Sequence, residues 1–98
     1  MNPELLQKAY AKFVEYFEDV STEAGSRMTT TYAERIYTQL KATDLNNAMV
    51  SCELMSELNR STWASFTGVR VAQDLRLSDV ERRAFSRFLF GYPDILGA

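Results

Sequence analysis

Residues 77–98 read LSDVERRAFSRFLFGYPDILGA and carry the clearest helix signals in this sequence. Ser78 and Glu81 have the spacing of a capping box, in which each side chain satisfies a backbone N–H group at the start of a helix. Gly91 suits the left-handed conformation that ends a helix, and Pro93 prevents its continuation. These signals predict one helix over residues 79–90, after a turn at residues 76–78.

This C-terminal helix contains more aromatic side chains than one buried face can hold. The apolar residues that share a face on a helical wheel are expected in the core; they are Val80, Ala84, Phe85 and Leu89. Aromatic residues and arginine are the types most enriched at binding hot spots. We therefore expect the remaining aromatic and arginine residues to form a partner-binding surface: Arg83, Arg87, Phe88, Phe90 and Tyr92. In the alternative interpretation, the segment folds back over the core as a flap.

The rest of the chain is also expected to be helical. Proline occurs only at positions 3 and 93, and no hairpin signal or sustained two-residue alternation is present. Asn2 and Pro3 predict the start of a first helix, which Gly25 is expected to end. Its apolar residues recur at three- and four-residue steps and are expected to be buried; they are Leu6, Tyr10, Phe13, Phe17, Val20 and Ala24.

Further helices are predicted in the middle of the chain. A second helix is expected from Thr31 to about Thr43, and Asp44 is expected to cap a third. The predicted buried face of the third helix consists of Leu45, Ala48, Met49, Cys52, Met55 and Leu58. An irregularity is expected within residues 59–68, either a bend in one long helix, which we favour, or a turn that starts a new helix at Ser61 or Thr62.

Length and composition predict a single all-α domain. The chain has 98 residues, of which 46% are hydrophobic and 24% are charged, as in an ordinary globular protein. Short connections make successive helices antiparallel neighbours. We expect residues 1–98 to form one small antiparallel helical bundle of four to five helices.

The residue types that are absent exclude several kinds of chemistry. The sequence has no histidine and a single cysteine, Cys52, so it cannot form an internal disulfide, a Cys/His zinc site or a histidine-based catalytic group. It also lacks a glycine-rich phosphate loop. We expect no enzymatic activity, no cofactor and no metal. No apolar run approaches the roughly 20 residues of a membrane span, and the polar, acidic N-terminus is unlike a secretory signal, so a cytoplasmic location without membrane contact is expected.

Charge is unevenly distributed along the chain, whose net charge is −2. Four acidic residues of the first helix form a candidate docking face for a basic partner: Glu15, Glu18, Asp19 and Glu23. In the second half of the chain every basic residue is an arginine, the residue preferred for stacking and for forked contacts with carboxylates.

These patterns favour a non-enzymatic protein–protein interaction module. We expect an inhibitor, adaptor or small regulatory protein that binds a partner, or itself as a homo-oligomer, through its C-terminal helix. One alternative is a helix-turn-helix-like DNA-binding regulator. Two observations oppose it: Arg76 or Leu77 stands where that motif usually has glycine, and the net charge of the chain is negative, unlike that of most nucleic-acid-binding proteins. A second alternative is a structural subunit of a larger helical assembly.

Overall fold

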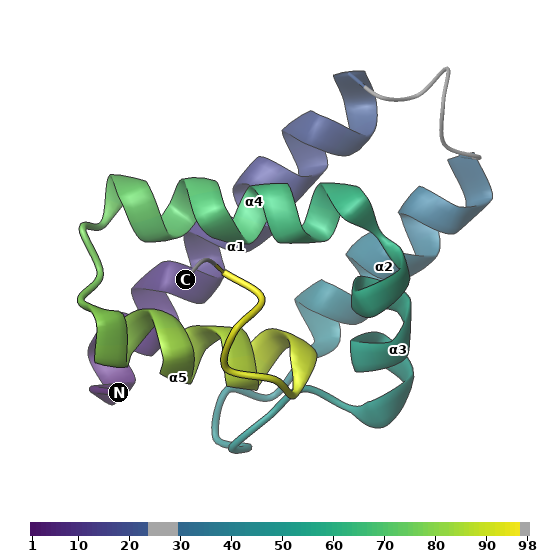
Figure 1. Cartoon of the computed structure of the whole chain (residues 1–98). Helices are drawn as coiled ribbons and strands as arrows, with labels where there is room; N and C mark the ends of the chain where they lie inside the picture. Colours follow the sequence, from purple (N-terminus) through teal and green to yellow (C-terminus); the bar gives the residue numbers. More distant parts are fainter. Residues whose placement is uncertain (24–29, 97–98) are drawn as a thin grey trace.

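Five α-helices and no strand form the described part of the chain, residues 1–23 and 30–96 of a computed structural model. In chain order they are α1 (Pro3–Glu23), α2 (Thr30–Ala42), α3 (Cys52–Arg60), α4 (Thr62–Asp74) and α5 (Asp79–Phe90). Figure 1 shows α4 and α5 running in opposite directions, with α1 crossing behind α4. The helices α2 and α3 lie together on the side where α4 begins. The predicted all-α class is therefore confirmed, as a compact arrangement of helices.

The start of α1 follows the sequence signals. The Asn2 side chain accepts a hydrogen bond from the backbone N–H of Glu4 at 2.8 Å, and Pro3 occupies the first helical position. Tyr10, Phe13 and Phe17 lie on one side of the helix and are buried, as their spacing predicts. The predicted helix end at Gly25 lies outside the described residues.

The predicted irregularity in the middle of the chain is a complete break at Ser61. Its backbone N–H donates to the Leu58 carbonyl at 3.1 Å, and its side-chain oxygen accepts from the Ala64 N–H at 3.2 Å. Ser61 therefore ends α3 and starts α4 in one residue. The preferred single long helix is wrong, and the alternative with a new start at Ser61 is correct.

The predicted start of the third helix at Asp44 is also wrong. The Asp44 carboxylate accepts from the Asn46 N–H at 2.9 Å and so closes a local turn, a use of Asp that competes with helix capping. The helix begins at Cys52 instead, with Ser51 as its cap. Because residues 45–51 are not helical, Ala48 and Met49, which were predicted to be buried, are exposed. Cys52, the first residue of α3, is exposed as well.

Aromatic packing between α1 and α5 forms the centre of the core. The Phe13 and Phe85 rings meet edge to face with centroids 6.3 Å apart, and the Tyr10 and Phe88 rings do the same at 5.7 Å. The Tyr10 hydroxyl also donates to the Leu40 carbonyl at 2.5 Å and so connects this centre to α2. Such pairs add about 1 kcal/mol each beyond the area they bury.

Tyr10 also makes the fold sensitive to alkaline pH. Burial raises the pKa of Tyr10 above its ordinary value of 10.0. An acid with a raised pKa stabilises the folded state at pH values below its unfolded pKa, and this contribution is lost as the pH rises through the folded pKa. We expect Tyr10→Phe to lower the free energy of unfolding by about 1 kcal/mol at neutral pH, because the Leu40 carbonyl loses a donor.

Urea unfolding at neutral pH and above pH 10.0 measures both effects. The loss of stability on alkalinisation should be smaller in Tyr10→Phe than in the unsubstituted protein. Tyr92→Phe, at an exposed tyrosine, is the control and should leave the neutral-pH stability unchanged. Identical alkaline losses in the unsubstituted protein and Tyr10→Phe would contradict this assignment.

Candidate interaction surface

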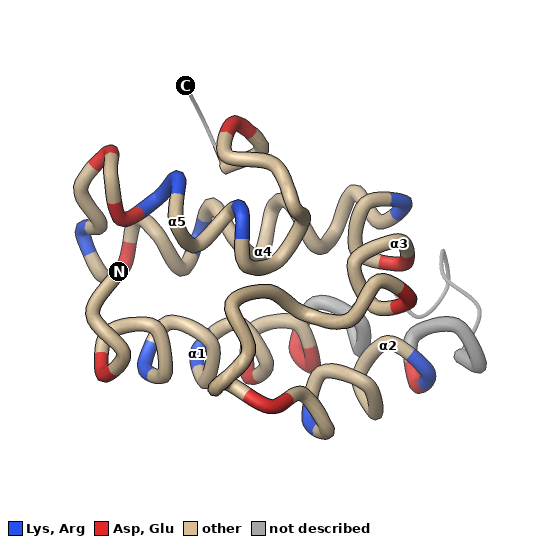
Figure 2. The backbone as a smooth tube through the Cα atoms, turned by 90° about the horizontal axis from the view of Figure 1, so that it is seen from below, with Lys and Arg blue, Asp and Glu red and all other residues tan. Residues whose placement is uncertain are grey.

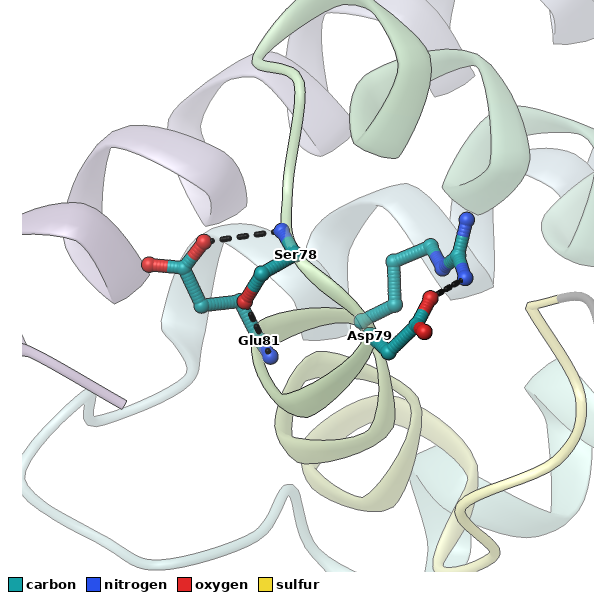
Figure 3. A network of polar contacts seen from close by, with 4 residues as sticks. Ser78, Asp79 and Glu81 are labelled. Carbon is teal, nitrogen blue, oxygen red and sulfur yellow. Dashed lines mark hydrogen bonds and ion pairs between the residues drawn. The ribbon is translucent and has the colours of Figure 1, made fainter.

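The ends of α5 are fixed by the two motifs that the sequence predicts. The Ser78 N–H donates to a Glu81 carboxylate oxygen at 2.9 Å, and the Glu81 N–H donates to the Ser78 hydroxyl at 3.2 Å, as Figure 3 shows. At the other end, Gly91 adopts φ = 80° and its N–H donates to the Arg87 carbonyl at 2.9 Å. Both motifs therefore define where α5 begins and ends.

The aromatic residues of α5 lie almost entirely in the core. Phe88 and Phe90, expected on a partner-binding surface, are only 2% and 1% exposed, whereas Val80, expected in the core, is 76% exposed. These predictions of exposure are wrong because α5 is covered from more than one side. Phe88 packs against Tyr10 of α1, and the Phe90 carbonyl accepts from the Asn59 side chain of α3 at 3.0 Å.

The residues after α5 fold back toward α4, as the flap interpretation predicts. The buried Ser86 hydroxyl donates to the Tyr92 carbonyl at 2.5 Å and accepts from the Ile95 N–H at 3.2 Å. Leu96 is buried against Gly68, where an added Cβ would lie 2.5 Å from the Leu96 Cδ2 atom. Figure 1 shows this tail, in yellow, passing from α5 toward α4. The Tyr92 side chain remains 62% exposed.

Among the exposed residues of the C-terminal segment, four define a candidate surface, the α5 ridge: Val80, Arg83, Arg87 and Tyr92. Asp94, in the tail after α5, is exposed as well. Val80, Arg83 and Arg87 follow one another at helical spacing and therefore share one side of α5.

Both acidic residues of α5 interact with neighbouring residues of the same segment. Asp79 pairs with Arg82 and Glu81 completes the capping box, as Figure 3 shows. Within the described part of the chain, Arg83 and Arg87 make no ion pair. The ridge is therefore a cationic line with an aliphatic residue at one end.

The predicted acidic docking face is only partly a free surface. Glu15, Glu18 and Asp19 are exposed on α1, while the side chain of Glu23 lies outside the described residues. The Tyr37 hydroxyl donates to Glu18 at 2.9 Å, and this hydrogen bond raises the pKa of Tyr37. Glu18 therefore links α1 to α2. Figure 2 shows both acidic and basic positions along α1, acidic positions on α3, and basic positions along the middle of α5.

A second exposed surface, on α4, was not identified from the sequence. Phe66 is 61% exposed and meets the half-buried Trp63 ring edge to face at 6.3 Å. The signal that indicates this surface is the absence of charged residues between Arg60 and Arg70, in a stretch that contains two aromatic residues. Depletion of charge around aromatic side chains is typical of the centre of an interface.

The connection between α4 and α5 bears on the DNA-binding alternative. Arg76 adopts φ = 51°, the left-handed conformation that glycine usually supplies at such a turn, and Leu77 after it is buried. However, α4 and α5 run in opposite directions in Figure 1, whereas the two helices of a helix-turn-helix cross steeply. The turn resembles that motif locally, but the helix arrangement does not.

Comparisons of this chain with protein-family models, curated proteins and solved structures give no match. Among the described residues, no group of three or more Cys, Asp or Glu side chains is arranged to hold a metal ion. None of the described helices is both long and apolar enough to cross a membrane. The exposed surfaces are therefore the features of the molecule that indicate a function.

Phe88 and Tyr92 provide a direct test of the division between core and surface. We expect Phe88→Ala to lower the free energy of unfolding by about 3–5 kcal/mol, because it leaves a cavity beside Tyr10. Tyr92→Ala should change it by about 0.5 kcal/mol or less, because the Tyr92 ring is exposed. Chemical denaturation followed by circular dichroism measures both. Equal losses in the two variants would show that this division is wrong.

Proposed function

We propose that this protein is a non-enzymatic interaction module that binds another protein through the α5 ridge. The observation that supports the proposal is the pair of exposed cations, Arg83 and Arg87. The two acidic residues of α5 do not neutralise them, because Asp79 pairs with Arg82 and Glu81 caps the helix. Such a module suits an inhibitor, an adaptor or a small regulatory protein.

The chemistry of the ridge indicates what its partner must offer. A guanidinium group binds a carboxylate through two parallel hydrogen bonds, so Arg83 and Arg87 favour a partner surface with paired or successive acidic side chains. Val80 and Tyr92 favour apolar contacts beside those acids. The partner is therefore expected to present an acidic surface that also contains aliphatic or aromatic residues.

The rigid support of the ridge favours binding. The capping box and the left-handed Gly91 fix both ends of α5, and the Ser86 hydroxyl fixes the backbone at Tyr92. A surface that is already ordered loses less conformational entropy when it binds.

Reversing the two ridge charges tests the proposal. We expect Arg83→Glu/Arg87→Glu to weaken partner binding by about 10- to 100-fold, because attraction to an acidic surface becomes repulsion. The control is Lys8→Glu/Arg60→Glu, which makes the same change in net charge at two exposed residues on α1 and α3. Proteins retained from the native host by the unsubstituted chain are identified, purified, and measured against each variant by calorimetry.

Support requires a partner whose affinity falls in the ridge variant and is preserved in the control. If both variants bind a partner equally weakly, the loss of affinity results from the change in net charge alone. If no partner binds the ridge variant more weakly than the unsubstituted protein, the proposal is wrong. Titration with duplex DNA at low salt is run in parallel. Binding that depends on Arg83 and Arg87 and weakens steeply with salt, without any protein partner, would replace the proposal with the DNA-binding alternative.

A further inference from the structure

A cavity of about 370 Å³ lies where the C-terminal half of α4 meets the start of α5 and the returning tail. Its apolar lining comes from α4, from the connection to α5 and from the tail: Val69, Ala72, Leu77 and Leu96. The last three of these side chains are buried. A cavity of this volume falls within the range of small-molecule binding sites.

The polar lining of the cavity is cationic. It consists of the Gln73 amide and the guanidinium groups of Arg76 and Arg82. Arg76 is exposed and makes no ion pair with another described residue. The Arg82 guanidinium pairs with Asp79, but its Nε atom is buried and has no hydrogen-bond partner among the described residues. A buried polar atom without a partner is uncommon in a folded protein, and a bound ion or molecule is one explanation for it.

The charges around the cavity favour an anion with a single charge. Each acidic side chain of residues 70–82 already has a partner: Asp74 accepts from Tyr16, Asp79 pairs with Arg82, and Glu81 accepts from Ser78. Only the carboxylate of Asp79 is bound to a guanidinium of the cavity, so the Arg76 guanidinium remains without one. A single uncompensated guanidinium favours a carboxylate over a phosphate group, which carries nearly two charges.

The backbone at Arg76 points to the same residue independently. Arg76 follows Leu75, the C-cap of α4, and adopts φ = 51°. Glycine is the usual residue at this position, because a Cβ atom makes the left-handed conformation unfavourable. The turn is fixed by the Leu77 N–H, which donates to the Ala72 carbonyl at 3.0 Å. Strained backbone of this kind is concentrated at functional sites. Arginine here lowers the stability of the turn and supplies a guanidinium to the cavity.

We propose that this cavity binds a small organic acid, with its carboxylate held by Arg76 and Arg82 and its apolar part against Leu77 and Leu96. A guanidinium binds a carboxylate through two parallel hydrogen bonds. The apolar lining excludes water from one side of this ion pair and so strengthens it. The site shares no residue with the α5 ridge, and it is therefore a binding function additional to the one proposed above.

Hexanoate, a straight-chain aliphatic acid, is the probe for this site. A titration of the full chain followed by the NMR signals of its backbone amides should show saturable shifts at residues 73–77 and 96. The expected dissociation constant is about 1 mM, as is reasonable for so small a ligand. Hexanamide has the same apolar chain without the charge, and inorganic phosphate has charge without the apolar chain. Both should bind about 10-fold more weakly or less tightly still.

Two substitutions at Arg76 separate binding from folding. Arg76→Gly should weaken hexanoate binding by about 10-fold and raise the melting temperature by about 2–4 °C, because it removes the guanidinium and also relieves the left-handed strain. Arg76→Gln removes the charge but keeps the Cβ atom, and it should weaken binding to the same extent. The matched control is Arg83→Gln, which removes the charge of an exposed arginine outside the cavity and should preserve binding.

Three results would each overturn the proposal. The first is the absence of saturable shifts with hexanoate, or shifts confined to residues that do not line the cavity. The second is equal affinity for hexanoate and hexanamide, which would show that the arginines do not bind the carboxylate. The third is unchanged affinity in Arg76→Gln, or an equal loss in Arg83→Gln. Circular dichroism verifies that all variants are folded. None of these results bears on the α5 ridge, which is tested with its own charge variants.

Discussion

Edge-to-face packing of aromatic rings joins α5, the last helix, to α1, the first. Two ring pairs, Phe13 with Phe85 and Tyr10 with Phe88, hold the helices together. Once α5 is in place, its backbone accepts hydrogen bonds from other parts of the chain. The Phe88 carbonyl accepts from the Val50 N–H at 3.0 Å, which anchors the loop before α3, and the Phe90 carbonyl accepts from Asn59 on α3. The same helix supplies the Ser86 hydroxyl that holds the tail.

This packing determines what the surface of α5 can offer. Because the aromatic residues at positions 85, 88 and 90 are used in the core, the outward side of the helix is left mainly to arginine. The aromatic surface is found instead on α4, where Phe66 is exposed beside Trp63. One half of the chain thus carries two surfaces of different chemistry, a cationic ridge on α5 and an uncharged face on α4.

Local rules predicted the start of α1 and both ends of α5, but they failed at Asp44 and at Ser61, where a local turn and a new cap were missed. Tertiary packing explains the errors on the faces of α5 and α4. Asn2, Ser78 and Gly91 cap helices through groups within a few residues, so their roles can be recognised from spacing alone. A helical wheel assumes one buried face, but α5 is covered by α1, by α3 and by the returning tail, which is why Phe88 and Phe90 were assigned to the wrong environment. The exposed Phe66 was missed for the converse reason. A charge-free aromatic stretch normally indicates core, and only the arrangement of the helices shows that this one faces outward.

The proposed role of the α5 ridge follows from charge and symmetry together. Like charges that meet across a two-fold axis repel, so the α5 ridge is poorly suited to self-association and well suited to a partner of opposite charge. The exposed side of α4 has no charged residue between Arg60 and Arg70. If the α5 ridge formed a symmetric contact between two copies, it would have to bury unpaired guanidinium groups against each other. Burial of unpaired charge costs several kcal/mol, more than a small helix–helix contact returns. Binding of an acidic partner through α5 is therefore the arrangement that leaves no arginine of the ridge buried without a carboxylate.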